Sequence, residues 1–185
     1  MYKKPKKSET FMEDESLLEE GRNRKGDASM YKYAVHIMAG CAVFFASAFA
    51  AFYEGSALAH NTWEWSYSTP VTTLMGGEVE EASDIVRLDY FYYAAKHEPA
   101  FPLIMMASIL YIMLICGLML LRLKKRNAVM YFGLMAAFFV GGAGTLMEVT
   151  SSGGRWFVSL FAMTAVVAGA YAIIAWRSLQ KEADI

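Results

Sequence analysis

Carboxylates and one arginine gather near the ends of the apolar segments of this chain. Glu54 follows the first long apolar block, Glu148 ends the third, and Asp89 and Arg155 lie in the adjacent polar stretches. A carboxylate at a membrane edge can bind a cation, pair with an arginine or relay protons. The same side chains could instead be solvated interface groups, because ionisable residues are most informative deep in a bilayer. The pattern indicates a candidate ion site and leaves the plain interpretation open.

A histidine lies inside the first apolar block. His36 sits about one turn from the start of that block, where an imidazole could ligate haem or a metal. Two axial histidines at similar depth would be needed for a buried haem, and His60 and His97 both fall on the opposite side. The 13 methionines could bind Cu(I), but methionine is also a common apolar filler. We therefore expect no cofactor and no metal.

Aromatic side chains mark the long polar stretch after the first block. Trp63 and Trp65 flank Glu64, and Tyr90 follows further along. Exposed aromatic residues often anchor protein interfaces, so these four residues are candidate contacts for a partner. Tryptophan is also enriched at the headgroup level of membranes, which is the alternative interpretation.

Small residues recur at four-residue spacing in two of the apolar blocks. This pattern lets membrane helices approach closely and predicts a tight intramolecular bundle or a homo-oligomer. The stripes are Ala42, Ala46 and Ala50 in the first block, and Gly133, Ala137 and Gly141 in the third.

Catalytic signatures are absent from the sequence. It contains no phosphate-binding loop, no nucleophile elbow, no HExxH and no CxxC motif, so we expect a protein that is not an enzyme. The net charge of −1 gives no indication of a nucleic-acid partner.

The elements that position these residues are four long apolar blocks. We predict membrane helices at about 31–53, 99–123, 128–149 and 156–176, since each block is long enough to cross roughly 30 Å of hydrocarbon. The predicted fold is therefore an all-α membrane protein, a four-transmembrane-helix bundle within residues 30–178. Short links between the last three helices favour antiparallel neighbours.

The distribution of basic residues predicts the orientation. With the N-terminus in the cytoplasm, all of the 17 Lys and Arg residues lie inside except Arg87, Lys96 and Arg155. We therefore expect both termini in the cytoplasm, the plasma membrane of a bacterium as the location, and the lipid bilayer as the surroundings. No cleavable signal peptide is visible, so the first block is expected to act as an uncleaved anchor.

The remaining segments are polar. Residues 1–29 are predicted to be a disordered or loosely helical cytoplasmic tail, and residues 179–185 a second tail. Residues 54–98 form one long outer loop. Within it, Ser83 could cap a short amphipathic helix that begins near Asp84, with Ile85, Leu88, Tyr92 and Ala95 on its apolar face.

Several short motifs resemble a known family. Tyr53-Glu54-Gly55-Ser56, Trp63-Glu64-Trp65, and the Leu88-Asp89-Tyr90-Phe91 segment that leads to Pro102 resemble the uncharacterised small bacterial membrane proteins of the YjdJ type. The resemblance covers residues 31–122. It implies a bacterial membrane location and no known activity, and it makes the third and fourth helices an extension beyond the family's two.

Three functions remain open from the sequence. The first is a non-enzymatic interaction or accessory subunit that uses its outer loop to bind a membrane-protein partner or a second copy. The second is a small cation transporter or channel, with Glu54, Asp89 and Glu148 at an acidic mouth. The third is a haem- or quinone-linked redox subunit.

Overall fold

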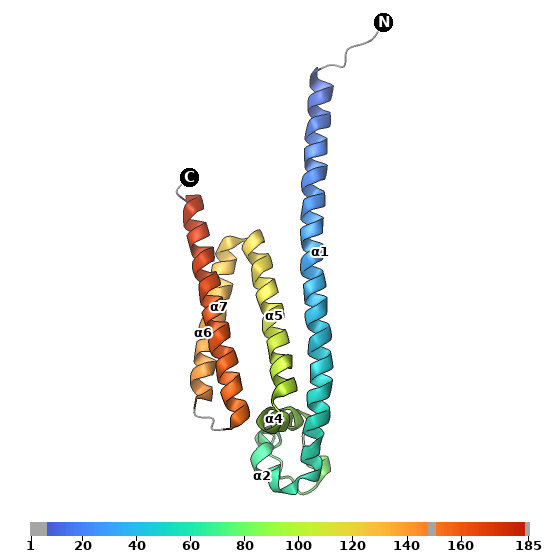
Figure 1. The fold of residues 1–185 in the computed structure, drawn as a ribbon, viewed down its shortest axis with the longest axis vertical. Helices are drawn as coiled ribbons and strands as arrows, with labels where there is room; N and C mark the ends of the chain where they lie inside the picture. Colours follow the sequence, from blue (N-terminus) through green and yellow to red (C-terminus); the bar gives the residue numbers. More distant parts are fainter. Residues whose placement is uncertain (1–6, 148–150, 184–185) are drawn as a thin grey trace.

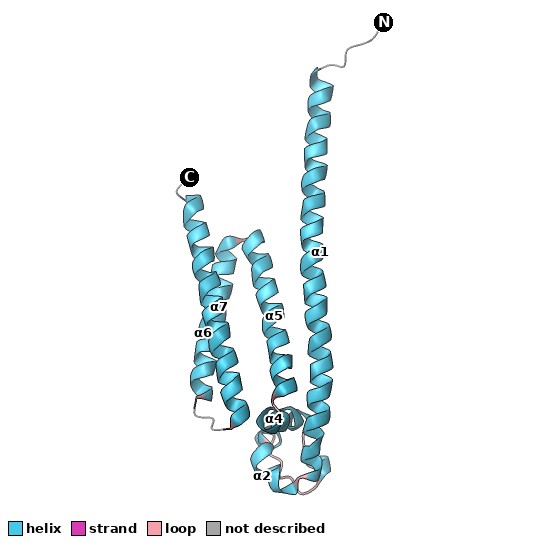
Figure 2. Ribbon diagram, in the orientation of Figure 1, coloured by secondary structure: helices cyan, strands magenta, loops and turns pink. Residues whose placement is uncertain are grey.

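Four long helices dominate the computed structural model, which describes residues 7–147 and 151–183 (Figure 1). They are α1 (Lys7–Gly55), α5 (Ala100–Leu123), α6 (Lys125–Leu146) and α7 (Ser152–Ala183). Every regular element in the described part of the chain is helical (Figure 2), so the predicted all-α class is confirmed.

All four helices are long and apolar enough to cross a membrane. The qualifying segments are Met30–His60, Ala100–Leu123, Lys125–Leu146 and Gly153–Lys181. The shortest of them, with 22 residues, is about 33 Å long at 1.5 Å per residue, which exceeds the ~30 Å hydrocarbon core. The predicted blocks therefore agree with the structure, with ends displaced by a few residues.

The N-terminal segment is part of the first long helix. α1 is continuous from Lys7, so residues 7–29 have the helical one of the two predicted states, and the helix projects past the ends of the other three (Figure 1). The segment contains five Glu, two Lys and two Arg residues, which are good helix formers. Joined to a long apolar helix, it needs no nucleus of its own, because adding residues to an existing helix costs far less than starting one.

The four helices form a row rather than a closed bundle. α5 lies between α1 on one side and the α6–α7 pair on the other (Figure 1). α5, α6 and α7 run antiparallel to their chain neighbours, as the short links predict. α1 packs on α5 and stands at the edge of the row.

The tightest contact joins α6 to α7, where large side chains meet small ones. Phe132 and Phe139 of α6 are buried, and so are Ala168 and Ala175 of α7. The Phe132 ring also stacks on Tyr171, with centroids 5.3 Å apart. Burying phenylalanine against alanine removes much apolar surface from contact with lipid while the backbones stay close.

The predicted small-residue stripes lie on other faces than the contacts within this chain. Ala42 and Ala46 are exposed, whereas Gly40, which lies against Ile112 and Tyr111 of α5, is buried, as are Ser47 and Ala51. On α6, residues Gly133, Ala137 and Gly141 are also exposed, and a methyl group at either glycine would meet open space. Apart from the half-buried Ala50, the residues of these stripes therefore lie on exposed faces of the described helices. The larger side chains on the opposite faces bury more surface. Their use in a homo-oligomer stays a prediction.

Between α1 and α5 the chain folds into a small domain, residues 56–99, called the cap. It contains η1 (Ser56–His60), η2 (Thr62–Glu64), α2 (Trp65–Ser68), α3 (Pro70–Leu74), η3 (Ala82–Asp84) and α4 (Arg87–His97). The cap lies at the end of the row opposite the N-terminus (Figure 1).

The cap helix α4 begins later than predicted and buries a different face. Asp84 accepts hydrogen bonds from the backbone N–H groups of Glu80 and Glu81, which closes η3 and leaves Val86 extended before α4. Ser83 therefore does not cap it. Leu88 and Tyr92 are exposed, whereas Asp89 and Ala94 are buried. The face of α4 that is buried is the one with Asp89, because this side chain accepts hydrogen bonds from α3. The spacing of apolar residues alone cannot predict such an orientation.

Two glycines bring other helices onto the backbone of α4. A methyl group at Gly55, the last residue of α1, would lie 1.9 Å from the carbonyl oxygen of Tyr90. A methyl group at Gly153, in the first turn of α7, would lie 2.0 Å from the carbonyl oxygen of Ala95. No real side chain fits at such distances, so glycine is required at both contacts.

We expect Gly55→Ala to destabilise the protein, because the added methyl group must separate α1 from α4. The expected cost is roughly 1–3 kcal/mol, typical of overpacking. Thermal unfolding in mild detergent measures it, and Gly133→Ala is the matched control because its added methyl group meets open space. Equal melting temperatures for the two variants would contradict the contact.

Candidate interaction site in the cap

A buried carboxylate organises the cap. Asp89 is 0% exposed and accepts hydrogen bonds from the backbone N–H groups of Val71 (2.8 Å) and Thr72 (2.9 Å). It also accepts the Thr72 hydroxyl at 2.6 Å. Val71 and Thr72 belong to the first turn of α3, which Pro70 begins. Asp89 thus caps α3 from a distant part of the chain, since the first N–H groups of any helix lack partners within it.

Thr72 extends this network to the segment that enters α4. The backbone N–H of Val86 donates to the Thr72 hydroxyl oxygen at 2.9 Å. The hydroxyl therefore accepts from Val86 and donates to Asp89. It joins α3 both to the residue just before α4 and to the first turn of α4. A buried polar network of this kind fixes one arrangement when every member is satisfied.

A second polar cluster lies where η2 and α2 meet the end of α4. The Lys96 ammonium donates to Glu64 Oε2 at 2.6 Å and to the Ser68 hydroxyl at 3.1 Å. The Ser68 hydroxyl in turn donates to the same Glu64 oxygen at 2.6 Å. His97 Nε2 lies 3.4 Å from that oxygen, and its ring packs on Tyr93.

This cluster keeps Glu64 ionised. The hydrogen bond from Lys96, with a smaller effect from Ser68, lowers the pKa of Glu64 from its ordinary 4.5 to about 2, although partial burial acts in the opposite direction. Glu64 was predicted as a contact for a partner. Its carboxylate is instead engaged inside the cap.

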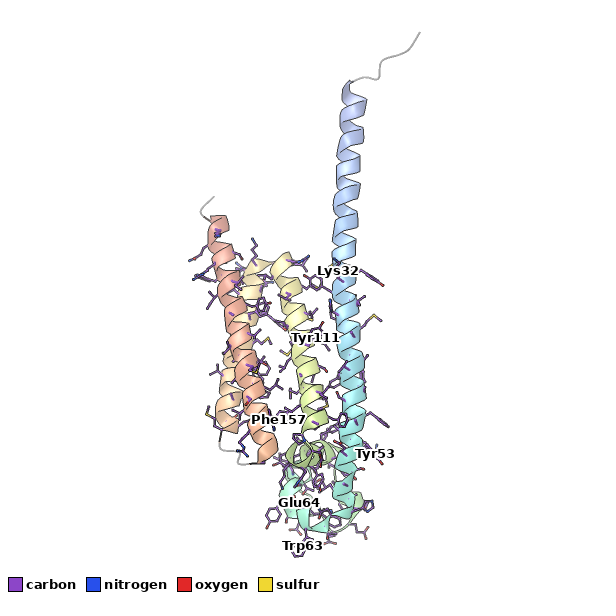
Figure 3. All side chains as sticks on the ribbon, in the orientation of Figure 1. Lys32, Tyr53, Trp63, Glu64, Tyr111 and Phe157 are labelled. Carbon is purple, nitrogen blue, oxygen red and sulfur yellow. The ribbon has the colours of Figure 1, made fainter. Side chains whose placement is uncertain are left out.

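The two predicted tryptophans have different surroundings. The Trp65 indole N–H donates to the carbonyl oxygen of Leu58 at 2.9 Å, and Leu58 is fully buried. Trp63 is 87% exposed and lies at the tip of the cap, away from the ends of the long helices (Figure 3). Trp65 therefore belongs to the framework of the cap, while Trp63 is available on its surface.

Tyr90 also serves the framework. Its backbone carbonyl faces Gly55, and its ring packs edge to face against Phe52 with centroids 5.4 Å apart. It joins the cap to the last turns of α1 and is half-buried.

The predicted ion site is not assembled in the described residues. Both oxygens of Asp89 accept backbone or hydroxyl hydrogens, Arg155 is exposed, and Glu148 lies outside the described residues. Glu54 is half-buried, and its Oε2 atom is buried without a hydrogen-bond partner. Over the same part of the chain, no group of three or more His, Cys, Asp or Glu side chains is placed to hold a metal ion.

Several residues of the cap network were not predicted. Thr72, Ser68 and Lys96 each take part in hydrogen bonds between segments far apart in the sequence. The Ser/Thr-rich stretch and Pro70 indicated a turn, but no local signal pairs residues 64 and 68 with residue 96.

Comparison with known proteins agrees with this architecture. The model of a family described as a domain of unknown function, DUF4306, matches residues 34–121, which span the apolar part of α1, the cap and most of α5. The uncharacterised protein YjdJ of Bacillus subtilis (strain 168) is 32% identical over 74 residues, which cover 39% of this chain and 68% of YjdJ. The chain belongs to the YjdJ family. No solved structure matches it.

The YjdJ-type region ends within α5, and the α6–α7 hairpin lies beyond it. The resemblance predicted from the sequence is therefore confirmed, with limits close to residues 31–122. Both polar networks of the cap lie inside the matched region.

We expect Asp89→Ala to unfold the cap, because it removes the partner of two buried backbone N–H groups and one hydroxyl. The expected loss is roughly 2–4 kcal/mol, above that of an exposed helix cap. Limited proteolysis between residues 56 and 99 reports it, with the exposed Glu78→Ala as control. Equal cleavage of the two variants would show that Asp89 does not hold the cap.

The stability of the cap should depend on pH through Glu64. A carboxylate whose pKa is lowered on folding stabilises the folded state above its unfolded pKa, near 4.5, and this contribution is lost as the pH falls toward about 2. At neutral pH, Glu64→Gln should cost roughly 1–2 kcal/mol, since the pair is partly exposed and screened.

Thermal unfolding of wild type and Glu64→Gln between pH 7 and pH 2.5 tests this dependence. The difference in melting temperature should be largest at pH 7 and should narrow below pH 4.5. A difference that is constant across this range would mean that the Lys96 pair does not stabilise the cap.

Proposed function

We propose that this YjdJ-family protein is a non-enzymatic accessory subunit of the bacterial plasma membrane whose cap holds a partner protein on the outer face. The observation that carries the proposal is Trp63, which is 87% exposed at the tip of a cap in which the neighbouring Glu64 and Trp65 are engaged internally. Exposed tryptophans on a fixed scaffold are strong anchors for protein interfaces.

The outer location of the cap follows from charge. Four basic residues lie where α5 ends and α6 begins, at the end of the row opposite the cap, and such clusters tend to stay in the cytoplasm: Arg122, Lys124, Lys125 and Arg126. Both termini lie at that same end (Figure 1), so the proposal places them inside and the cap outside.

Further exposed apolar side chains extend the surface around Trp63. Tyr67 follows four residues later in the nearly continuous η2–α2 helical segment, so it shares a face with Trp63. Leu74 and Met75, at the end of α3, are exposed as well. A cap with satisfied polar groups and exposed large apolar groups is typical of an interaction module.

The position of Trp63 relative to the ends of the long helices favours contact with a partner protein over a place among the lipid headgroups. Trp63 lies beyond the ends of the long helices, while Tyr53, near the end of α1, lies at the level where a belt residue is expected (Figure 3). The acidic mouth of a cation channel has weaker support, because the oxygens of Asp89 are engaged in capping α3.

Trp63→Ala should abolish co-purification of the partner without lowering the amount of protein in the membrane. The measurement is mild-detergent purification from the native membrane followed by quantitative mass spectrometry. Tyr53→Ala, which removes another exposed aromatic ring, is the matched control and should retain the partner. Trp65→Ala should instead reduce the protein level, since it breaks the hydrogen bond to Leu58.

Two results would overturn the proposal. Wild-type protein that brings no stoichiometric protein with it would remove the accessory role. A Trp63→Ala variant that keeps the full complement of co-purifying proteins would remove the tip of the cap as the contact.

A further inference from the structure

A narrow slot opens along the seam between α1 and α5, near the middle of the membrane-length part of these helices. Its volume is about 350 Å³, at the lower end of the ~300–1,000 Å³ typical of small-molecule sites. Its lining is apolar apart from hydroxyl groups. The lining residues are Ala39, Gly40, Val43, Ile104, Ala107, Ser108 and Tyr111.

A polar pair lies at one end of this slot. His36 Nδ1 and the Tyr111 hydroxyl are 2.7 Å apart, and both side chains are exposed on the surface of the row. Tyr111 lies on α5 where it faces α1 (Figure 3). His36 is one helical turn from Gly40, which lines the slot.

The pair keeps one hydrogen-bond donor unused. A neutral imidazole and a phenol carry one polar hydrogen each, and their mutual hydrogen bond uses only one of the two. If the Tyr111 hydroxyl donates, the Nε2–H of His36 is left; in the other tautomer, the hydroxyl hydrogen is left. Among the described residues, neither group has a second partner. In hydrocarbon such a donor requires an acceptor.

The other hydroxyl in the slot cannot serve a ligand in this way. The Ser108 hydroxyl donates to the backbone carbonyl of Ile104 at 2.8 Å. The slot therefore provides one donor, no charged group in its lining, and a floor of small residues that leaves room for a flat ring.

A second groove continues from the same floor on the other side of α5. Its volume is about 260 Å³, and Ala107 and Tyr111 line both spaces. Leu160, Met163, Thr164 and Val167 of α7 form its far wall. An apolar chain attached to a ring in the slot thus has a path along the row.

We infer that the slot binds a lipid-soluble quinone. A quinone carbonyl oxygen would accept the spare hydrogen of the His36–Tyr111 pair, the flat ring would lie over the exposed Ala39 and Ala107, and the isoprenoid tail would follow the apolar walls. A quinone has acceptors and no donors, which complements a site with one free donor. The inference concerns binding alone and uses only the membrane placement of the proposed function, not its partner.

A quinone suits the site better than a phospholipid. A phospholipid carries a phosphate that needs cations, and the slot lining has none. Lys32, one helical turn before His36 in α1, does not line the slot.

The test uses the purified full chain in detergent and a decyl-substituted benzoquinone as the probe. Isothermal titration should give saturable binding at one site per chain. Decylbenzene, with the same tail and no carbonyl, should bind at least tenfold more weakly. Each of His36→Phe and Tyr111→Phe leaves one donor and should weaken binding only partly. The double variant should weaken it at least tenfold.

Ala107→Phe fills the slot from an exposed position and should abolish binding, whereas Ala137→Phe, an equally exposed alanine of α6, should leave it unchanged. The proposal is overturned if wild type shows no saturable binding, if decylbenzene binds equally, or if the double variant and Ala107→Phe bind like wild type. It is also overturned if native mass spectrometry finds a phospholipid that the quinone cannot displace. Because no partner protein is present, these outcomes are independent of the test of the cap.

Discussion

The backbone contacts of α4 with Gly55 and Gly153 constrain the whole arrangement. One contact lies at the end of α1 and the other at the beginning of α7, so a single short helix spans two long helices that have little contact with each other. Both contacts place a glycine against a carbonyl oxygen of α4 with no room for a side chain. The position of α4 therefore sets the distance between α1 and α7 at the cap end of the row. This distance also sets how much space is left on either side of α5.

The position of α4 in turn depends on where its buried polar group is satisfied. Asp89 could face the core only because α3 offers two free backbone N–H groups and a hydroxyl at its first turn. Glu64 and Lys96 similarly neutralise each other within the cap. Glu64 and Lys96 are therefore less available to a partner than the exposed apolar side chains of Trp63, Leu74 and Met75.

The sequence predicts the long helices well and the cap poorly, for a physical reason. Membrane helices follow from the length and hydropathy of local segments, so Ala100–Leu123 agrees with its prediction almost to the residue. The cap depends on pairs distant in sequence, such as Asp89 with Thr72, which leave no periodic signal. The composition correctly separated polar from apolar segments but could not distinguish Trp63 from Trp65, because a hydrogen bond to Leu58 decides that difference. The small-residue spacing likewise could not indicate which face of α6 packs within the chain, and it is the face with Phe132, Met135 and Phe139 that is buried.

The limits of the YjdJ-type region suggest how the two halves of the molecule divide their tasks. The region from α1 through α5 contains both polar networks of the cap and the His36–Tyr111 pair, so it has the groups that could recognise another molecule. The α6–α7 hairpin has its own tightly packed core and adds Gly153 beneath α4 and the α7 wall beside Tyr111. A hairpin that packs firmly on itself can be added at the side of a two-helix protein without disturbing its networks. Its effect is to support α4 from the second side and to turn the open flank of α5 into a groove.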